Sequence, residues 1–525
     1  MQVVEDPDVD NYLKWGDRVG IDHSKIVYPI RFSEGYIGSI AKETIFPGES
    51  IIKVPNTALL TTNSALNSQL AELYQEADEL FDHSNPAYED LVISTFLVYV
   101  KHKGDPFWST FVEMQPKDIP ILQDWSSQEI DQLQNPYLKF DLKKRLAEDM
   151  GIWATWKQHL SSFQSYFSES MLEWSEFYWA WKVISTRAFG KFVPHTTLAP
   201  IAEFLNHTNV STFYSYNLPD EEPDASLRYS DESDQDHDDL LNLPIKRTLL
   251  YYNDLVKVNL LSRESAQTEL LEELCNEATA YEDKIFSEIA SKAEADNLNT
   301  SLEESPEAEL RIVSGETYQK GSEVFLSYGR YSNRQLLTYY GFAFENNKYD
   351  YAPIYITLDE IATSQQVPYI NENLEKKVIE IKAKKNLLQQ ELLNCFRAIH
   401  WDFEHGKEAF FAPKSLELEK KVLEETKTFL KGMLGNFETS LEEDLELLSQ
   451  NLPLKLRFAV IYRSEIKKII HKQVEYISIL ERITNNLVSG QASNQVTEDL
   501  ETSEDPQSIE AIKNYLASLL HNLSF

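Results

Sequence analysis

Two short stretches that lie far apart in the chain constrain the fold more than any other feature. Each stretch mixes strand-forming aromatic residues with turn residues. The first contains Arg187-Ala-Phe189 and Phe204-Leu-Asn-His207. The second contains Ser327-Tyr-Gly329, Ser332-Asn333 and Tyr340-Gly-Phe342. A strongly acidic segment separates them and is densest at 220–239. Because so dense a run of like charges cannot pack in a core, we expect a surface loop there. The two stretches are then expected to meet across it in one site.

Composition indicates a large folded protein with an acidic surface. The chain has 525 residues, 42% of them hydrophobic and 12% aromatic, which is enough for two or more cores. Its formal net charge is −36, from 85 acidic and 49 basic residues. Such a surface repels nucleic-acid phosphates and attracts a basic protein, so we expect no nucleic-acid partner. The alternative is that the charge only keeps the protein soluble.

Cysteine usage and hydropathy predict an intracellular protein without a membrane span. The two cysteines, Cys275 and Cys395, are too few for a disulfide framework or a cysteine-built zinc site. The N-terminus lacks the charged and apolar regions of a signal peptide. The longest apolar run, 91–100, is about half a bilayer span, so we expect a core helix. The predicted location is the cytoplasm, with the nucleus as a second possibility.

Periodicity divides the chain into a β-rich beginning and long helical blocks. An amphipathic helix over 8–20 precedes strand-like segments at 24–32, 36–41 and 50–54. Helical spacing then dominates from about 60 to 185, and 184–217 reads as short strands and turns. Beyond residue 351 the pattern predicts helices, and the long amphipathic segments are 376–397, 416–434 and 455–487. Ser440 and Glu443 form a capping-box sequence that should open another helix.

Several common chemistries lack their signatures. The chain has no phosphate-binding loop, no Gly-x-Ser-x-Gly elbow and no His-Glu-x-x-His pair, and no metal is expected. Taken singly, the candidate residues have ordinary explanations. Tyr328 could pack in a core, Arg187 could form a surface ion pair, and Asn206 could be a turn residue.

Taken together and in this order, the elements of the two stretches resemble the SET-domain protein-lysine methyltransferases. The nearest branch is the Rubisco-methyltransferase-like group, and the chain is similar to its fungal ribosomal-protein lysine methyltransferases. Residues 33–38 and 47–55 look like the group's opening strands. Residues 439–448 and 463–470 resemble its helical substrate-binding domain. The resemblance therefore covers most of the chain.

This resemblance implies an α+β fold. We expect a β-rich pseudoknotted SET core over 1–345, with a helical insertion at about 60–183 and an acidic insertion at about 218–309. An all-α C-terminal domain of the Rubisco-methyltransferase substrate-binding type should follow over 350–520.

The resemblance also assigns roles to individual residues. Tyr328 would be the catalytic tyrosine. The residues expected to bind S-adenosylmethionine are Glu34, Tyr36, Arg187, Asn206 and His207. Those expected to wall the lysine channel are Phe189, Glu203, Tyr214, Tyr216, Tyr340 and Phe342. Two departures stand out: Glu203 occupies a position where the family usually has Asp, and the glycine turn is lengthened to 35–38. Which residue of 34–38 contacts the cofactor is therefore left open.

The implied function is S-adenosylmethionine-dependent methylation of a lysine in a basic protein, first of all a ribosomal protein, by a monomeric enzyme. Two alternatives are a non-catalytic SET-like module that binds a basic protein as chaperone or scaffold, and a methyltransferase for cytochrome c or a histone-like protein. The acidic insertion is expected to help recruit the basic substrate.

Overall fold

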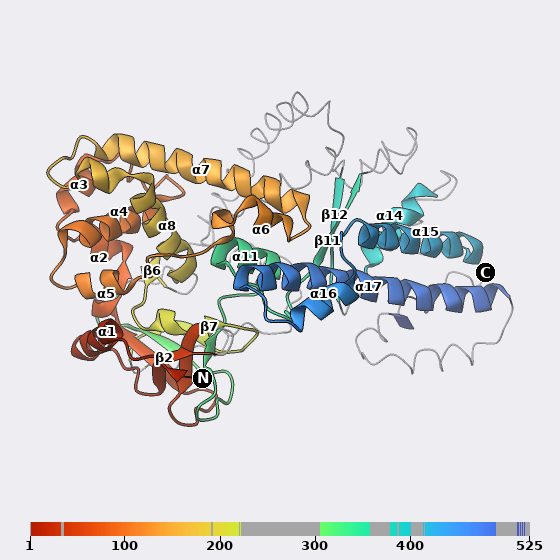
Figure 1. The fold of residues 1–525 in the computed structure, drawn as a ribbon, viewed down its shortest axis with the longest axis horizontal. Coiled ribbons are helices and arrows are strands. Elements are labelled where there is room, and N and C mark those ends of the chain that lie inside the picture. Colours follow the sequence, from red (N-terminus) through yellow and green to blue (C-terminus); the bar gives the residue numbers. More distant parts are fainter. Residues whose placement is uncertain are drawn as a thin grey trace.

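The computed structural model describes most of the chain outside the acidic insertion. The described residues are 2–32, 36–190, 193–219, 221, 305–357, 378–385, 388–400, 413, 415–489, and 512, 513, 515, 517 and 519 (Figure 1). Glu34, Cys275, nearly all of the acidic insertion and the helix expected at 262–295 lie outside them. Among the described helices, none is long and apolar enough to cross a membrane.

The N-terminal part builds two small sheets beside a capped helix. Helix α1 (Pro7–Arg18) starts at Asp6, whose side chain accepts from the Asp8 N–H. One antiparallel sheet has the order β1-β2-β3, with bounds Gln2–Val3, Ile26–Arg31 and Ile37–Ala41. A second has the order β4-β9-β8, with bounds Ser50–Pro55, Glu309–Val313 and Phe213–Asn217. The strands predicted near the N-terminus are therefore confirmed. The second sheet also joins segments from both sides of the acidic insertion.

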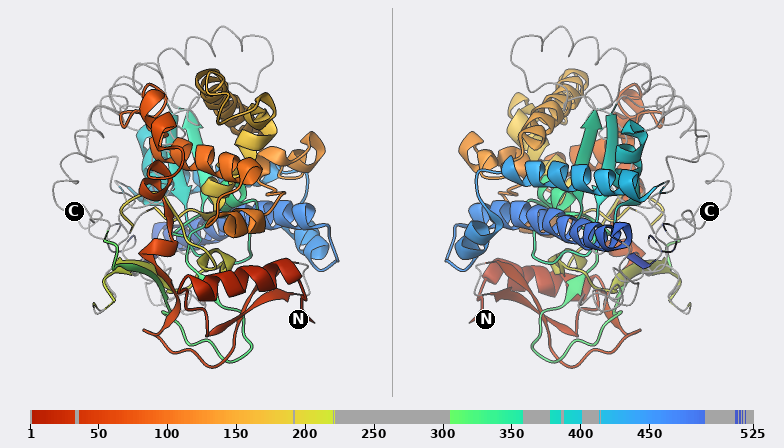
Figure 2. Two further views of the ribbon diagram at one scale, coloured as in Figure 1. Left: turned by 90° about the vertical axis from the view of Figure 1, so that its left-hand side faces the viewer. Right: turned by 90° about the vertical axis from the view of Figure 1, so that its right-hand side faces the viewer.

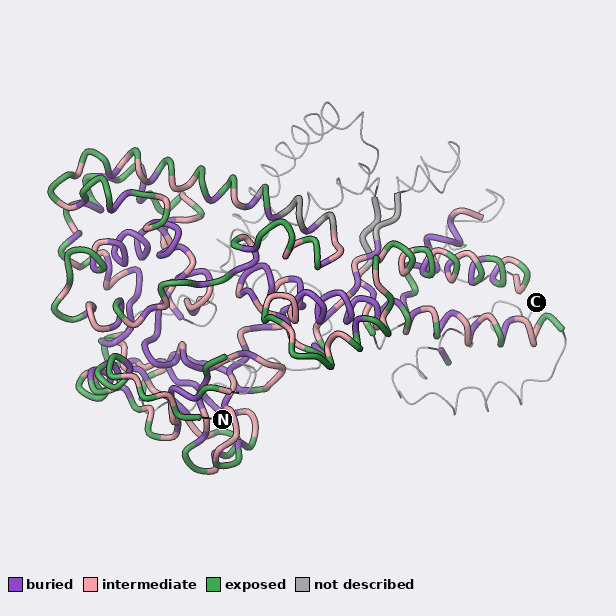
Figure 3. Tube along the Cα trace, in the orientation of Figure 1, coloured by how far each residue is buried: buried purple, intermediate pink, exposed green. Residues whose placement is uncertain are grey.

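The expected helical insertion is confirmed as a block of helices that covers one side of these sheets (Figure 1). Its α-helices are α2 (Thr62–Leu66), α3 (Ala71–Glu76), α4 (Tyr88–Lys103), α5 (Ser109–Met114), α6 (Ser127–Asp131), α7 (Pro136–Leu160) and α8 (Trp174–Arg187). Buried residues line α4, α8 and the first half of the last long helix of the chain (Figure 3). Most tryptophans of this block are core residues, with Trp156 and Trp181 almost fully buried, and Trp153 and Trp174 are half-buried against the same core. One expectation was wrong: 184–187 is the last turn of α8, because no glycine or proline interrupts the helical pattern there.

The two stretches do meet in space. Strand β7 (Asn206–His207) lies parallel to β10 (Phe325–Leu326), with Asn206 opposite Phe325 and His207 opposite Leu326. The short strands β5 (Leu60–Thr61) and β6 (Thr197–Leu198) pair nearby, and a 3-10 turn, η4 (Ala202–Phe204), leads into β7. Helix α11 (Asn333–Tyr340) follows β10 and begins with a capping box at Ser332. The site is therefore assembled around a short parallel strand pair.

The C-terminal region is helical, as expected, and forms a second core. Helices α14 (Gln390–Ile399), α15 (Leu416–Gly435), α16 (Leu441–Leu448) and α17 (Leu454–Val488) pack together, with α15 and α17 side by side (Figures 1 and 2). The capping box at Ser440 is confirmed. This core also takes in Leu122, Leu138 and Leu142, so part of the insertion packs into the C-terminal core.

The description of this region as all-α needs one correction. Strand β11 (Ala352–Thr357) pairs antiparallel with β12 (Val378–Ala383), so the segment 376–397 is not one helix, and its helix begins only at Gln390. Val378-Ile-Glu-Ile-Lys382 is rich in β-branched residues, which favour strands once a pairing partner is present. Propensity over a few residues could not show that partner.

Candidate active site

Tyr328 is held from three sides at the end of β10. Its hydroxyl donates a 2.9 Å hydrogen bond to the Leu205 carbonyl, and its backbone N–H donates to His207 Nδ1 at 3.0 Å. Its ring stacks on the His207 ring with 5.0 Å between centroids. Burial raises the pKa of Tyr328 to about 12, although the nearby Arg187 cation opposes this. The hydroxyl is therefore a neutral donor with a fixed direction.

An aromatic cluster surrounds Tyr328. Tyr340 lies 5.1 Å from its ring, and Phe342 lies 6.3 Å from Tyr340 and 6.2 Å from His207. Burial raises the pKa of Tyr340. Helix α11 carries Tyr340 and ends at Gly341 with φ +79°, where an added Cβ would lie 2.0 Å from the Pro120 carbonyl oxygen. Only glycine fits that turn, so the close contact with residue 120 fixes where the cluster lies.

The remaining expected channel tyrosines lie in different surroundings. Tyr214 on β8 meets Phe189 edge-on at 4.9 Å, and it acts electrostatically on Tyr340. Tyr216, two residues further on, donates its hydroxyl to Asn56 Oδ1 at 3.0 Å. The structure therefore brings Tyr214 and Phe189 toward the Tyr328 cluster and attaches Tyr216 to the turn after β4.

A polar network joins Tyr36, Asn206 and Glu323 at the edge of this cluster. Asn206 Nδ2 donates to the Ile37 carbonyl and to Glu323 Oε1, each at 3.0 Å. The Tyr36 hydroxyl donates to Glu323 Oε2 at 2.8 Å. Gly38 permits this approach, because a Cβ there would lie 2.6 Å from Asn206 Nδ2. Sequence reasoning missed Glu323, and its place beside the Gly321 turn was the only available signal.

Two buried donors in the site lack a protein partner within the described residues. His207 Nδ1 lies 3.0 Å from the Tyr328 backbone nitrogen and 3.3 Å from the Leu326 carbonyl oxygen. We assign Nδ1 as the acceptor in the shorter contact, which places the proton of the neutral ring on Nε2, where it has no acceptor among the described residues. Burial lowers the pKa of His207 to about 4, which keeps the ring neutral. Arg187 Nε at the end of α8 is also buried without a partner. Buried donors of this kind are expected to be satisfied by a polar ligand or by an ordered water.

Glu203 has partners that the sequence did not suggest. It was expected to wall the channel, but its carboxylate accepts from the Tyr12 hydroxyl at 3.3 Å and from Gln115 Nε2 at 3.0 Å. Burial raises the pKa of Glu203, and the neighbouring Arg187 opposes the effect. Tyr12 belongs to α1 and Gln115 directly follows α5, so no local pattern connects them with Glu203.

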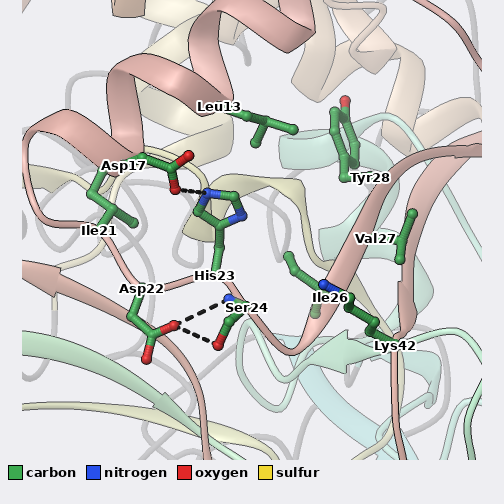
Figure 4. Close-up of a pocket in the computed structure, with 10 residues that line it drawn as sticks. All are labelled: Leu13, Asp17, Ile21, Asp22, His23, Ser24, Ile26, Val27, Tyr28 and Lys42. Atoms are coloured by element: carbon green, nitrogen blue, oxygen red, sulfur yellow. Dashed lines mark hydrogen bonds and ion pairs between the residues drawn. The ribbon is translucent and has the colours of Figure 1, made fainter.

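A separate pocket of about 420 Å³ opens between α1 and β2 (Figure 4). Within it, His23 Nε2 lies 3.1 Å from Asp17 Oδ1, and Asp22 accepts from Ser24. Its wall includes Tyr28, whose ring stacks on Phe204 of η4 at 3.6 Å. The pocket therefore adjoins η4 through Tyr28, and its lining contains none of the residues predicted to bind the cofactor or to carry catalysis.

Sequence comparison matches both halves of the chain. The family described as "Rubisco LSMT substrate-binding" matches residues 363–470. SET domain-containing protein 4 of Mus musculus is 26% identical over 209 residues, which cover 37% of this chain and 46% of that protein. N-lysine methyltransferase setd6 of Xenopus laevis is 25% identical over 342 residues, 64% of this chain and 57% of that protein. The chain thus spans about half the length of these curated relatives.

Structural comparison shows the fold. The crystal structure of the SET domain of LSMT bound to lysine and AdoHcy superposes with a TM-score of 0.55 at 15% identity, covering 99% of each chain. The structure of Rubisco LSMT bound to AdoMet superposes with a TM-score of 0.53 at the same identity, covering 96% of this chain and 99% of that one. The chain therefore has the SET-domain fold of these structures, and its C-terminal part matches the Rubisco LSMT substrate-binding family. The resemblance to the SET-domain and Rubisco-methyltransferase-like proteins is therefore confirmed, and the closer similarity to the fungal ribosomal-protein enzymes stays a prediction.

Proposed function

We propose that this protein is an S-adenosylmethionine-dependent protein-lysine N-methyltransferase that acts on a basic protein. The observation that carries the proposal is the placement of Tyr328, whose neutral hydroxyl is fixed on the Leu205 carbonyl within an aromatic cluster. The frog relative is named as an N-lysine methyltransferase, and the superposed LSMT structure holds lysine and AdoHcy.

The residues around Tyr328 suit such a cofactor. Arg187 offers a cation and a buried Nε–H that has no partner in the described part of the chain, and both fit the carboxylate of an amino-acid group. Asn206 and His207 on β7 would hold the adenine part, largely through their backbone, and Tyr36 would lie beside it. Once bound, S-adenosylmethionine supplies the activated methyl group. The role of Glu34 is a prediction that rests on the sequence alone.

The aromatic cluster accounts for activation of the substrate amine. A free lysine has a pKa near ~10.4 and must lose its proton before it can attack a methyl carbon. Enclosure among Tyr340, Phe342 and Tyr214 would desolvate the ammonium and favour the neutral amine. Tyr328 need not act as a base, since its pKa of about 12 keeps it protonated. Its oxygen would instead orient the amine, and orientation can supply several kcal/mol.

A ribosomal protein is the first substrate candidate. The chain's net charge of −36 favours a strongly basic partner, and the matched C-terminal family is described as substrate-binding. Cytochrome c and a histone-like protein remain alternatives, because they are also positively charged. We place the enzyme in the cytoplasm, with the nucleus as a second location, and expect it to act as a monomer.

Two measurements test the proposal. Calorimetric titration with S-adenosylhomocysteine should show one site, and labelled methyl groups should be transferred into one band of an extract from cells that lack this protein. Mass spectrometry of that band then identifies the lysine. Binding without transfer into any fraction would favour the non-catalytic module, and absence of binding would refute the assignment of the cofactor.

The acidic insertion has its own test. We propose that 220–239 attracts the basic substrate over about a Debye length. Deleting these residues should raise KM at low salt and leave kcat unchanged, and the difference should shrink at high salt. Equal KM values for the deletion variant and the wild type at both salt concentrations would refute this role of 220–239.

A further inference from the structure

The turn that leads into the candidate site has an unusual backbone conformation. Ile201 has φ +67° and ψ −38°, a region that a β-branched residue rarely occupies. A conformation of this kind costs on the order of 1–3 kcal/mol and persists only where surrounding contacts hold it. It directly precedes η4, which is followed by Leu205 and then by Asn206 and His207. Whatever fixes Ile201 therefore also fixes the partners of Tyr328.

One hydroxyl in helix α1 holds this turn. The Tyr12 oxygen accepts a hydrogen bond from the Ile201 N–H at 3.1 Å and donates to Glu203 Oε1 at 3.3 Å. Its side chain is fully buried, and its ring meets Phe204 edge-on at 5.5 Å. Gly16, one turn further along α1, leaves room for the Ile201 side chain, because an added Cβ would lie 2.5 Å from Ile201 Cδ1. Helix α1 is thus shaped to the turn at two points.

A second element holds the Glu203 carboxylate from another direction. Gln115 Nε2 lies 3.0 Å from Oε1 and 3.3 Å from Oε2 of that carboxylate. Gln115 is 3% exposed and follows α5, in the helical insertion. Donors from α1 and from the insertion therefore converge on one carboxylate.

The charges of the Glu203 carboxylate and of Arg187 shift the pKa values of neighbouring tyrosines in opposite directions. Each attracts the other electrostatically, and both act on the hydroxyls of Tyr28 and Tyr328. Arg187 Nε nevertheless has no hydrogen-bond partner within the described residues. Two neutral donors thus satisfy the carboxylate, and Arg187 keeps a buried donor for a ligand.

We propose that Tyr12 and Gln115 are positioning residues for the cofactor site. They hold the Ile201 turn and the Glu203 carboxylate, so that Arg187, Asn206 and His207 are preorganised for the ligand. This inference rests on the proposed function and deepens it. It gives the N-terminal helix a role in cofactor affinity, although no side chain of α1 would touch the cofactor.

Tyr12→Phe tests the proposal against a matched control, Tyr74→Phe. Tyr74 is also buried, and its hydroxyl donates to a backbone carbonyl, that of Val92 at 3.0 Å, within the same core and outside the site. Both variants remove one buried hydroxyl, and thermal unfolding should show the larger loss for Tyr12→Phe, because that hydroxyl makes two hydrogen bonds and the hydroxyl of Tyr74 makes one. Calorimetry with S-adenosylhomocysteine should show about tenfold weaker binding for Tyr12→Phe, and wild-type affinity for Tyr74→Phe.

A double-mutant cycle separates positioning from general loosening of the fold. Glu203→Gln should weaken binding as well, and the Tyr12→Phe, Glu203→Gln double variant should lose less than the product of the two single losses. A Tyr12→Phe protein with wild-type affinity, or losses that multiply independently, would overturn the positioning role. A wild-type protein that fails to bind S-adenosylhomocysteine would instead reject the proposed function, and this inference with it.

Discussion

The Tyr328 hydroxyl donates a 2.9 Å hydrogen bond to the carbonyl oxygen of Leu205, 123 residues earlier in the chain. Leu205 immediately precedes the Asn206-His207 strand, so this single bond ties the methyl-transfer half of the proposed site to its cofactor half. The bond also leaves the lone pairs of the phenol oxygen available to a second polar group.

Replacing Tyr328 by Phe should therefore lower kcat by about a hundredfold or more and leave S-adenosylhomocysteine affinity nearly unchanged. The ring still packs against His207 and Tyr340, but the oriented oxygen is lost. Labelled-methyl transfer and calorimetry measure the two quantities, with Tyr74→Phe as the control for a buried hydroxyl. Full turnover in the variant would remove Tyr328 from the catalytic role.

Gly38→Ala should weaken cofactor affinity by about tenfold or more, because loss of a well-placed polar contact has that order of effect. The added Cβ would lie 2.6 Å from Asn206 Nδ2 and 2.7 Å from Glu323 Oε1, so both side chains would have to move. Gly151→Ala in α7 meets nothing within 4 Å and is the control. Unchanged affinity in Gly38→Ala would show that Asn206 does not need its present orientation.

Asp350 should make the stability depend on pH. Burial raises its pKa to about 7, although Asn333 donates to it through both its backbone and its side chain. Since the folded state holds this proton more tightly, the stabilisation is complete below pH ~4 and is lost as the pH rises through about 7. Chemical denaturation should show a larger advantage of wild type over Asp350→Asn at pH 5 than at pH 8.

The exposed Glu307 provides the control for this measurement, because Glu307→Gln should give the same difference from wild type at both pH values. A difference between wild type and Asp350→Asn that is constant from pH 5 to pH 8 would contradict the prediction.

Asp444→Asn should cost about 3–5 kcal/mol of unfolding free energy, since it leaves two buried cations without their counter-charge. The Asp444 carboxylate lies 2.8 Å from Arg463 Nη2 and 2.6 Å from Lys467 Nζ, and all three side chains are at most 2% exposed. Arg463 also donates to the Gln132 carbonyl in the insertion, so the change should loosen the shared core. Denaturant unfolding measures the loss, and Glu446→Gln at an exposed position of α16 should leave stability nearly unchanged. Equal midpoints for the two variants would refute the prediction.

Much of the fold could be predicted from the sequence because its signals are local. The helix at the N-terminus, the three strands that follow and the capping box at Ser440 depend on residues within a few positions of one another. The strand at 378–383 escaped prediction because it depends on pairing with β11, more than 20 residues away.

The candidate site, too, was predicted from the sequence only in part. The sequence by itself determined the order of the elements around Arg187, Asn206-His207 and Tyr328, and it indicated that they meet. Only the tertiary structure decided that they meet through the parallel pairing of β7 with β10. It also decided that Glu203 accepts from Tyr12, 191 residues away, and from Gln115, rather than standing alone in a channel wall. A buried carboxylate takes its direction from whichever donors packing brings to it, and packing joins elements between which the sequence shows no periodic relation.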